Sequence, residues 1–313
     1  MDDLTTSNQA AQLILTTNTS IAATLQDQAQ QNASLAQQLA AMTADDQANK
    51  KALAGALLQI AQLMQQAGSV AGFSVNNVEA LAGWILAKGA AGNTNASGNT
   101  GTGSFVYDAS QKSATVSIVP TLPKVDPTKS AEFNGYFYIK LCGTDPDTGK
   151  PCPFPMPSFR FGLFIYEAEY YVPPTFWAAR HCAENEHRWH KGGFRYIMAS
   201  QGRLGTTGSS WHIYDHGAPA GSDKWWDSKV PCTMIAGSWH KITTLFQINP
   251  LDGTYVCLGI VTDDGVYHAL NKAISADSYT THKDWYLNSV QPDSDAAGDP
   301  FQYQVRNVKP TIL

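Results

Sequence analysis

A stretch of sixteen residues without one large apolar side chain divides this chain in two. Residues 89–104 read GAAGNTNASGNTGTGS, and Gly, Asn, Ser and Thr dominate them. Such side chains bury too little apolar surface to offset the entropy lost on ordering, so the stretch predicts a flexible linker. The residues before it are rich in Ala and Gln, whereas all five Cys, eight His and sixteen Pro follow it. The sequence therefore predicts two separate parts, residues 1–88 and residues 105–313.

The first part has the heptad spacing of a coiled coil. From Ile14 onward, apolar residues recur at alternating steps of four and three, and the pattern resumes after Thr43, a plausible helix N-cap. This spacing makes a narrow seam that joins helices side by side, which predicts a helical stalk. The seam residues are Ile14, Ile21, Leu25, Leu35, Leu39, Leu53, Leu57, Ile60 and Met64.

The seam also predicts self-association. Asn18, Gln28 and Asn32 interrupt it, and buried amides of this kind fix register and strand number. The outer faces carry Ala and Gln and no second apolar stripe, which favours a homotrimer over a monomeric bundle folded back on itself. No charge pairs at the flanking positions decide between two strands and three. A third, short helix is expected over residues 76–88, with Asn76 as its cap and Glu79 three residues later.

The second part is predicted to consist of short strands separated by turns. Asp252-Gly253 and Asp264-Gly265 are hairpin turn sequences, and they bracket a strand that is expected to pair with both neighbours. Eight such strands without intervening helices predict an antiparallel β-sandwich or jelly roll, so the fold class is α + β with segregated parts. The expected strands, rich in β-branched and aromatic residues, are 114–119, 135–141, 159–172, 194–200, 211–216, 241–248, 254–261 and 301–308.

The run from residue 237 to residue 271 resembles the late strands of concanavalin A-like sandwiches. In that family, Trp-His leads a strand, and a hairpin follows to a strand that ends in Asp-Gly. The segment YEAEYYVPPTF, residues 166–176, is similar to the long central strand of the polysaccharide-lyase branch. The resemblance implies a concanavalin A-like fold, which laminin-G-like modules, legume lectins, lyases and glucanases share. The residues that carry it are Trp239, His240, Asp252, Gly253, Asp264 and Gly265.

A helical stalk, a Gly/Asn linker and a β-sandwich head together resemble phage fibre and attachment proteins. The resemblance implies a virion protein made in the host cytoplasm, with residues 1–88 contacting other virion proteins. The N-terminus has Asp2 and Asp3 where a signal peptide needs basic residues, and no apolar run approaches the ~20 residues of a membrane span. The net charge of −5 disfavours nucleic acid as a partner, and no cofactor is expected.

Three functions remain open at this point. The head binds a surface glycan or receptor, or it is a polysaccharide-degrading enzyme on the same scaffold, or it is a structural fibre or decoration protein without a ligand. The adjacent Trp225 and Trp226 lie in the polar, turn-like segment GSDKWWDSK, which predicts at least one exposed indole for stacking on a sugar. Trp189, in a His-rich segment expected to be a loop, and Tyr170 and Tyr171 are further ligand-binding candidates.

Catalytic and metal-binding residues are not predicted. Glu167 and Glu169 share one face of a strand, but the glucanase pattern of Glu, Asp and Glu across five residues is absent, so a salt-bridged strand face is favoured. The segments HCAENEHRWH and WHIYDHG hold potential zinc ligands without a known spacing, and the Asp clusters at 145–147 and 293–299 match ordinary turns. Cys142 and Cys152 flank a short loop that a disulfide could close in an oxidising exterior, and free thiols are the default.

Overall fold

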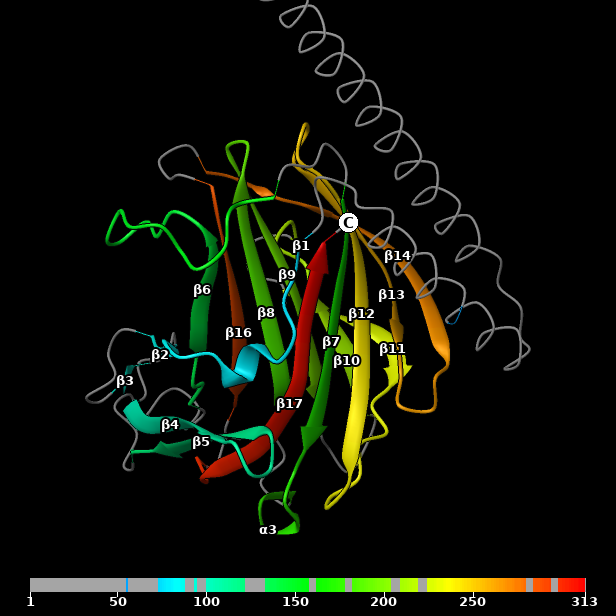
Figure 1. Ribbon diagram of the computed structural model, residues 1–313. Coiled ribbons are helices and arrows are strands. Elements are labelled where there is room, and N and C mark those ends of the chain that lie inside the picture. Colours follow the sequence, from blue (N-terminus) through cyan, green and yellow to red (C-terminus); the bar gives the residue numbers. More distant parts are fainter. Residues whose placement is uncertain are drawn as a thin grey trace, which may run out of the picture.

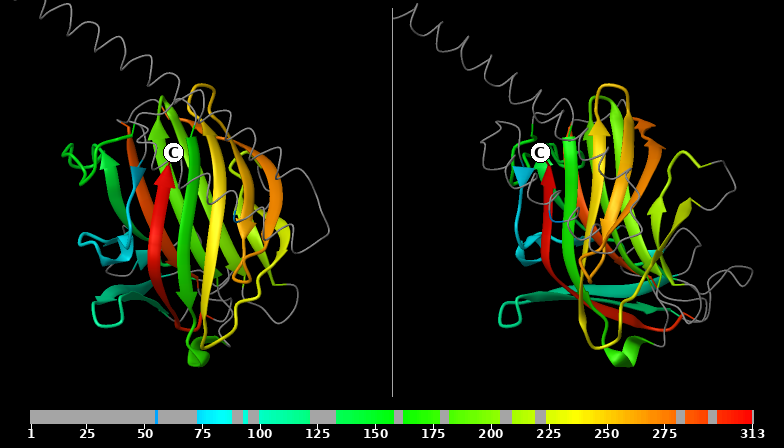
Figure 2. Two further views of the ribbon diagram at one scale, coloured as in Figure 1. Left: turned by 45° about the vertical axis from the view of Figure 1, so that its right-hand side comes forward. Right: turned by 90° about the vertical axis from the view of Figure 1, so that its right-hand side faces the viewer.

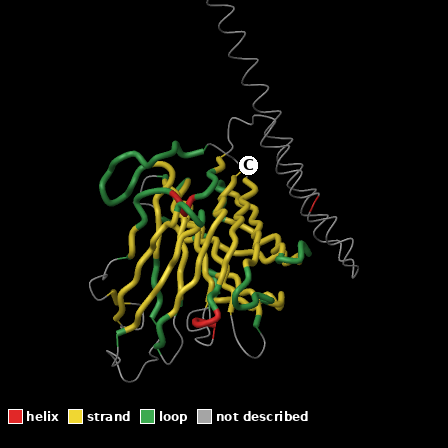
Figure 3. The backbone as a smooth tube through the Cα atoms, turned by 60° about the horizontal axis from the view of Figure 1, so that its bottom comes forward, coloured by secondary structure: helices red, strands yellow, loops and turns green. Residues whose placement is uncertain are grey.

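Two antiparallel β-sheets and almost no helix make up the part of the chain that the computed structural model describes (Figure 1; Figure 3). That part comprises residues 73–87, 93–94, 100–121, 133–157, 162–177, 182–203, 209–218, 224–279, 284–293 and 298–312, together with Gly55. The seam residues of the expected coiled coil, Ile14 to Met64, lie outside it. None of its helices is long and apolar enough to span a membrane.

Sheet A is the front layer in Figure 1. In its described residues it has nine strands, and β1 (Phe73–Ser74) pairs with the end of β17. The order of the other strands is β14 (Tyr267–Ser275), β13 (Thr254–Val261), β12 (Trp239–Asn249), β7 (Gly162–Tyr171), β17 (Phe301–Ile312), β5 (Ser113–Pro120), β4 (Thr100–Asp108) and β3 (Asn93–Thr94).

Sheet B lies behind sheet A, and Figure 2 shows the two layers from other sides. It has eight described strands, and β15 (Asp277–Ser278) pairs with β9 at its side. The order of the others is β11 (Trp225–Pro231), β10 (Ser210–Tyr214), β9 (Phe194–Arg203), β8 (Cys182–Lys191), β16 (Trp285–Pro292), β6 (Phe137–Gly143) and β2 (Ile85–Leu86).

The strands predicted from β-branched and aromatic residues are confirmed. Each of the eight expected segments overlaps a strand, namely β5, β6, β7, β9, β10, β12, β13 and β17. The two Asp-Gly turns are confirmed as well, because β13 pairs with both β12 and β14. Gly253 and Gly265 have φ angles of 73° and 76°, a conformation that glycine adopts without strain.

The core between the sheets is largely aromatic. Along β7, Phe164, Tyr166 and Tyr170 belong to it, as strand alternation requires. From sheet B, Trp189 of β8 stacks on Tyr286 of β16 with ring centroids 4.3 Å apart. Burying each such side chain contributes about 1.5–3 kcal/mol, so this layer of rings is a main source of stability.

The helix expected over residues 76–88 is wrong. Only the short 3-10 helix η1 (Val78–Ala80) forms there, and β2 follows it. The Glu79 carboxylate is buried and accepts hydrogen bonds from the backbone N–H groups of Asn307 at 2.9 Å and Val308 at 3.0 Å. It therefore satisfies a bulge in β17 instead of capping a helix. Phe73 and Val78 also belong to the core, so the sandwich begins at least 30 residues before the expected boundary at residue 105.

The end of the expected linker is also a strand. Residues 100–104 open β4, which pairs with β5 from Gly101 to Asp108. Gly101 and Gly103 serve close packing, because a Cβ atom there would lie 2.7 Å from the Phe133 ring and 2.8 Å from the Phe137 ring. The glycines that indicate flexibility in the sequence therefore let two aromatic rings approach the backbone.

Two expected loops are strands. The segment HCAENEHRWH lies mostly in β8, a central strand of sheet B, and Trp225 and Trp226 open β11 at its edge. In β8, the charged residues Glu184, Glu186 and Arg188 occupy every second position. This period of two is typical of a strand with a polar outer face. The polar composition of both segments hides this pattern in the sequence.

Candidate functional site

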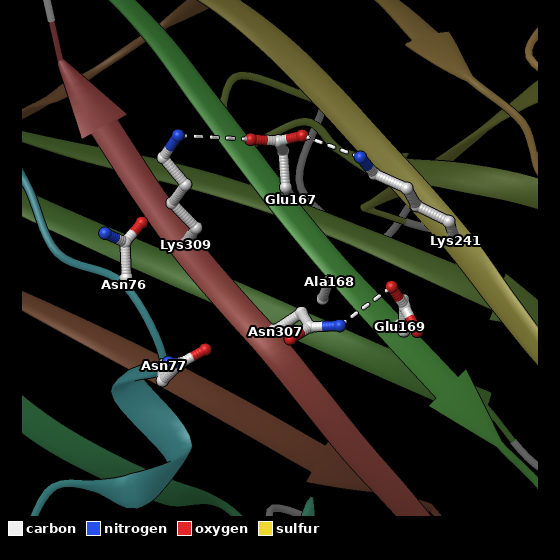
Figure 4. Close-up of a pocket in the computed structure, with 8 residues that line it drawn as sticks. All are labelled: Asn76, Asn77, Glu167, Ala168, Glu169, Lys241, Asn307 and Lys309. Carbon is white, nitrogen blue, oxygen red and sulfur yellow. Dashed lines mark hydrogen bonds and ion pairs between the residues drawn. The ribbon is translucent and has the colours of Figure 1, made fainter. Parts of the chain in front are cut away.

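Glu167 and Glu169 line a pocket of about 390 Å³ on the outer face of sheet A (Figure 4). Glu167 lies between two ammonium groups, 2.9 Å from Lys241 Nζ and 3.8 Å from Lys309 Nζ. The expected salt-bridged strand face is therefore confirmed. The rest of the lining is Asn76, Asn77, Ala168 and Asn307.

Glu169 is bound as firmly as Glu167. Its carboxylate accepts hydrogen bonds from Arg306 Nε at 2.7 Å and from Asn307 Nδ2 at 2.9 Å. Both carboxylates of this face thus have cations beside them, and these ion pairs link β12, β7 and β17.

A second group of acids lies on the outer face of sheet B, and none of these acids is among the residues that the sequence predicts to bind a ligand. Ala183 and Trp189 of β8 belong to the core, so the alternating residues Glu184, Glu186 and Arg188 point to the opposite face. The signal that was missed is this alternation. A run of polar residues with one Trp indicates a loop by composition, but by its period it indicates a central strand.

Glu186 holds the centre of this face. Its carboxylate binds Arg188 Nε and accepts a hydrogen bond from the Tyr136 hydroxyl at 3.3 Å. The Arg188 guanidinium lies over the Tyr136 ring, 5.0 Å from its centroid. Burial and the Glu186 charge raise the pKa of Tyr136 well above its ordinary value, so this phenol remains a hydrogen-bond donor at any physiological pH.

Glu184 is the chemically unusual acid. The amide nitrogen of Gln201 lies 3.0 Å from Glu184 Oε2 and 3.3 Å from Asp293 Oδ2, so two carboxyl groups meet at one amide. Burial, followed by the charges of Asp293 and Glu186, raises the pKa of Glu184 well above its ordinary value. Glu184 is therefore a buried acid whose surroundings favour its protonated form, and it lies two residues from Glu186 on the same face of β8.

Aromatic residues flank the acids on the same face. Tyr138 of β6 lies opposite Ser289, which lies opposite Glu186, and beyond Glu186 the row continues to Tyr214 and Trp225. Tyr138, Tyr214 and Trp225 are half-buried. The row crosses six strands from β6 to β11, which at ~4.8 Å per strand spacing is roughly 24 Å. We call it the aromatic–acid row.

The predicted ligand-binding aromatics fall in different places. Trp225 lies on the outer face with its ring 5.3 Å from that of Tyr214, whereas Trp226 packs against the core. The two indoles therefore point to opposite faces of a strand and both are half-buried, whereas the sequence predicts a turn-like segment with at least one exposed indole. Trp189 and Tyr170 have no exposed surface, and their burial removes them from the set of surface contacts. Tyr171 is half-buried on the outer face of sheet A, 5.5 Å from Trp239.

The metal and thiol candidates take structural positions. Burial lowers the pKa of His187 to about 3, and its Nδ1 lies 2.9 Å from the Tyr286 hydroxyl inside the core. Asp145 and Asp147 both bind Lys140 Nζ. In the part of the chain that the structure describes, no three His, Cys, Asp or Glu side chains are grouped to hold a metal ion. Cys142 and Cys152 are free thiols.

Comparison with known proteins gives distant likenesses only. No protein-family model matches the chain, and no curated protein matches its sequence. Among solved structures, it is similar to an endo-β-galactosidase from Clostridium perfringens that releases GlcNAcα1-4Gal, at 10% identity and a TM-score of 0.37 over 77% of this chain. The match spans 62% of that enzyme.

Two further structures are similar over 77% of this chain. Lectin II from Ulex europaeus has 9% identity, a TM-score of 0.36 and 97% of its own length covered. The CBM2 module of the evolved Dit protein of Lactobacillus casei BL23 phage J-1 has 8% identity, a TM-score of 0.35 and 94% covered. These neighbours are lectins, glycan-degrading enzymes and a phage module, and likenesses this distant assign no activity to the present chain.

Proposed function

We propose that this protein binds a carbohydrate chain along the aromatic–acid row of sheet B. The observation that carries the proposal is the order of residues in that row, with half-buried aromatic rings at both ends and Glu186 and Arg188 at the centre. Pyranose rings stack their C–H faces on aromatic planes, and their hydroxyl groups pair with carboxylates and guanidinium groups. A row of roughly 24 Å suits an oligosaccharide better than a single sugar.

The proposed biological setting is a virion fibre or attachment protein that presents the sandwich as its head. What supports it is the heptad spacing of residues 14–64, which favours a homotrimeric stalk that contacts other virion proteins. The boundary between the proposed stalk and the head can be tested with two fragments. Residues 73–313 should fold alone and residues 105–313 should not, because Phe73, Val78 and Glu79 belong to the sandwich.

Sedimentation tests the proposed stalk. Residues 1–72 should form a multimer by themselves, while residues 73–313 should have a smaller subunit number. A monomeric 1–72 fragment at micromolar concentration, or a trimeric 73–313 fragment, would contradict the proposed oligomer. Replacement of Leu35 and Leu39 by Asp should dissociate the full chain, because each would bury an unpaired charge.

Glycan-array binding of the full chain tests the proposed site. Trp225→Ala and Tyr138→Ala should each weaken binding of the best neutral glycan about tenfold, because each removes a stacking surface at one end of the row. Trp226→Ala is the matched control, since its ring faces the core. It should lower the melting temperature and leave binding per folded molecule unchanged. Loss of binding in Trp226→Ala alone would contradict the proposed face.

Glycan cleavage is a second candidate, which the Glu184–Glu186 pair favours. A carboxylic acid beside a carboxylate is the arrangement that glycoside hydrolysis requires, and Glu184 has the raised pKa of a proton donor. Release of reducing ends from a polysaccharide panel tests it. Cleavage that disappears in both Glu184→Gln and Glu186→Gln would establish an enzymatic activity. Glycan binding without any cleavage would show that the protein only binds carbohydrate.

A further inference from the structure

The outer face of sheet A holds a second set of groups suited to a ligand, on the side of the sandwich opposite the aromatic–acid row. Its pocket lies where β12, β7 and β17 run side by side (Figure 4). Three cations, Lys241, Lys309 and Arg306, stand around two carboxylates, Glu167 and Glu169. At the pocket surface the cations outnumber the carboxylates by one, with the Glu79 carboxylate buried behind Asn307, whereas the centre of the row in sheet B is rich in acids.

Lys309 is the cation of this pocket that is available to a ligand. Lys241 already approaches Glu167 Oε1 to 2.9 Å, and Arg306 is held by Glu169 at 2.7 Å. Lys309 Nζ lies 3.8 Å from Glu167 Oε2, which is beyond hydrogen-bond distance, and its side chain is 31% exposed. An incoming carboxylate would gain a direct charge-assisted hydrogen bond without breaking a short one.

Further donors face the same opening. Asn76 and Asn77, just before η1, and Asn307, in the β17 bulge, are exposed and line the pocket with amide groups. Amide N–H groups donate to hydroxyl and carboxylate oxygens. The pocket therefore offers an acceptor-rich ligand several donors around the Lys309 ammonium group, whose ion pair with Glu167 is long.

An aromatic platform continues from the pocket along the strands. Tyr171 follows Glu169 by two residues on β7, about 7 Å along the strand, and Trp239 of β12 lies opposite it. Both rings are half-buried, and the Arg306 guanidinium lies 3.9 Å from the Trp239 ring centroid. Arg306 thus links the platform to Glu169 in the pocket wall. A neighbouring sugar ring would stack on this platform.

We propose that the pocket and the Trp239–Tyr171 platform bind an acidic oligosaccharide, with the carboxylate of one sugar unit at Lys309 and the next unit on the aromatic rings. The ligand class follows from the weakly paired, partly exposed Lys309, the surrounding amides and the aromatic platform next to them along the strands. This site is independent of the row in sheet B, because the two lie on opposite outer faces of the sandwich.

Calorimetric titration of the full chain with tetragalacturonate tests the proposal, and its methyl ester serves as the uncharged ligand. The acid should bind about fivefold more tightly than the ester, as expected for an exposed charge pair. Lys309→Met should reduce the affinity for tetragalacturonate to the affinity for its methyl ester. Lys150→Met, an exposed lysine far from the pocket in the Asp145–Lys150 turn, is the control and should change nothing.

Glu167→Gln gives a prediction of opposite sign. It removes the carboxylate that competes for Lys309, so it should strengthen acid binding about threefold and leave ester binding unchanged. Trp239→Ala should weaken acid and ester equally, because stacking does not depend on the ligand's charge. Trp225→Ala should leave both unchanged, which separates this site from the proposed row.

Several outcomes would overturn the proposal. They are absence of tetragalacturonate binding, equal affinity for acid and ester, or full binding in a folded Lys309→Met variant. Sodium acetate at the same carboxylate concentration should not compete, because it has no sugar ring for the platform. Effective competition by acetate would show a simple anion site and would also contradict the proposal.

Discussion

The two outer faces of the sandwich carry the same residue types, but the glutamates on them differ in exposure and in their neighbours. On sheet A, Glu167 and Glu169 are 19% and 21% exposed and have Lys241 and Arg306 beside them. On sheet B, Glu186 is 9% exposed, and Glu184 is buried next to two other acids. Both pairs have the spacing Glu-x-Glu on one strand. The surroundings, and not the spacing, distinguish the two pairs, because burial and neighbouring acids raise the pKa of Glu184.

The largest predicted difference between the faces comes from two matched arginines. Arg188 and Arg306 each bind a glutamate on their own face and lie over an aromatic ring. Arg188→Met should cost about 3 kcal/mol of unfolding free energy, because it leaves Glu186 charged, little exposed and close to Glu184. Arg306→Met should cost about 1 kcal/mol or less, because Glu169 is more exposed and keeps its Asn307 hydrogen bond.

Urea unfolding at pH 7 measures both free energies. A circular dichroism spectrum of each folded variant is the control for a retained fold. Equal losses for the two variants would show that the faces are equivalent and that the acid cluster of sheet B is no more sensitive than the paired acids of sheet A.

A smaller and pH-dependent effect should distinguish Glu184. Its pKa is raised above 4.5, so its contribution to stability is fully present below that pH and is lost as pH rises through the folded-state pKa. Glu184→Gln keeps an oxygen that can accept the hydrogen bond from the Gln201 amide, and it removes the titratable carboxyl group. The unfolding free energy of the wild type should therefore fall relative to that of Glu184→Gln as pH rises from 4 to 9.

Asp252 provides a control of opposite sign. Hydrogen bonds from the Thr254 side chain and backbone lower the pKa of Asp252, so its contribution is present above the ordinary pKa and lost as pH falls. Asp252→Asn should therefore change the unfolding free energy only at acidic pH. An identical slope for the wild type and Glu184→Gln would contradict the assignment of Glu184 as the protonated acid.

The sequence was sufficient for the fold of the second part and insufficient for the site. Strands such as β12 and β13 follow from their β-branched residues and Asp-Gly turns, which are local properties. Glu184 and Asp293 are 109 positions apart in the sequence and meet only because β8 pairs with β16. Burial of Glu184 and its closeness to Asp293, which raise its pKa, depend on sheet topology, which local patterns do not encode.

The aromatic candidates show the same limit from another side. Trp225 and Trp226 lie on opposite faces of β11 because neighbouring strand residues alternate, a placement that their turn-like composition does not predict. Tyr170 and Tyr171 alternate in the same way, but the sequence does not say which of them faces the core. The assignment needs the partner sheet, because burial of one face appears only when β8 and β7 pack together.

The smallest predicted difference concerns one lysine on each face. Lys241 is 53% exposed beside Glu167, and Lys309 is a second cation for the same carboxylate, so Lys241→Met should change the unfolding free energy by about 0.5 kcal/mol at most. Lys140 is 10% exposed and binds Asp145 and Asp147 together. Lys140→Met should cost about 1–2 kcal/mol, because two carboxylates lose their shared donor.

Raising the salt concentration sharpens this last comparison. At 1 M salt the Debye length is about 3 Å, so the small effect of Lys241→Met should disappear, whereas the cost of Lys140→Met should persist because its ion pairs are partly shielded from solvent. Urea midpoints at 0.05 M and 1 M sodium chloride give the test. Equal salt sensitivity of the two variants would mean that solvent screens both lysines alike, and the difference in their exposure would then have no electrostatic consequence.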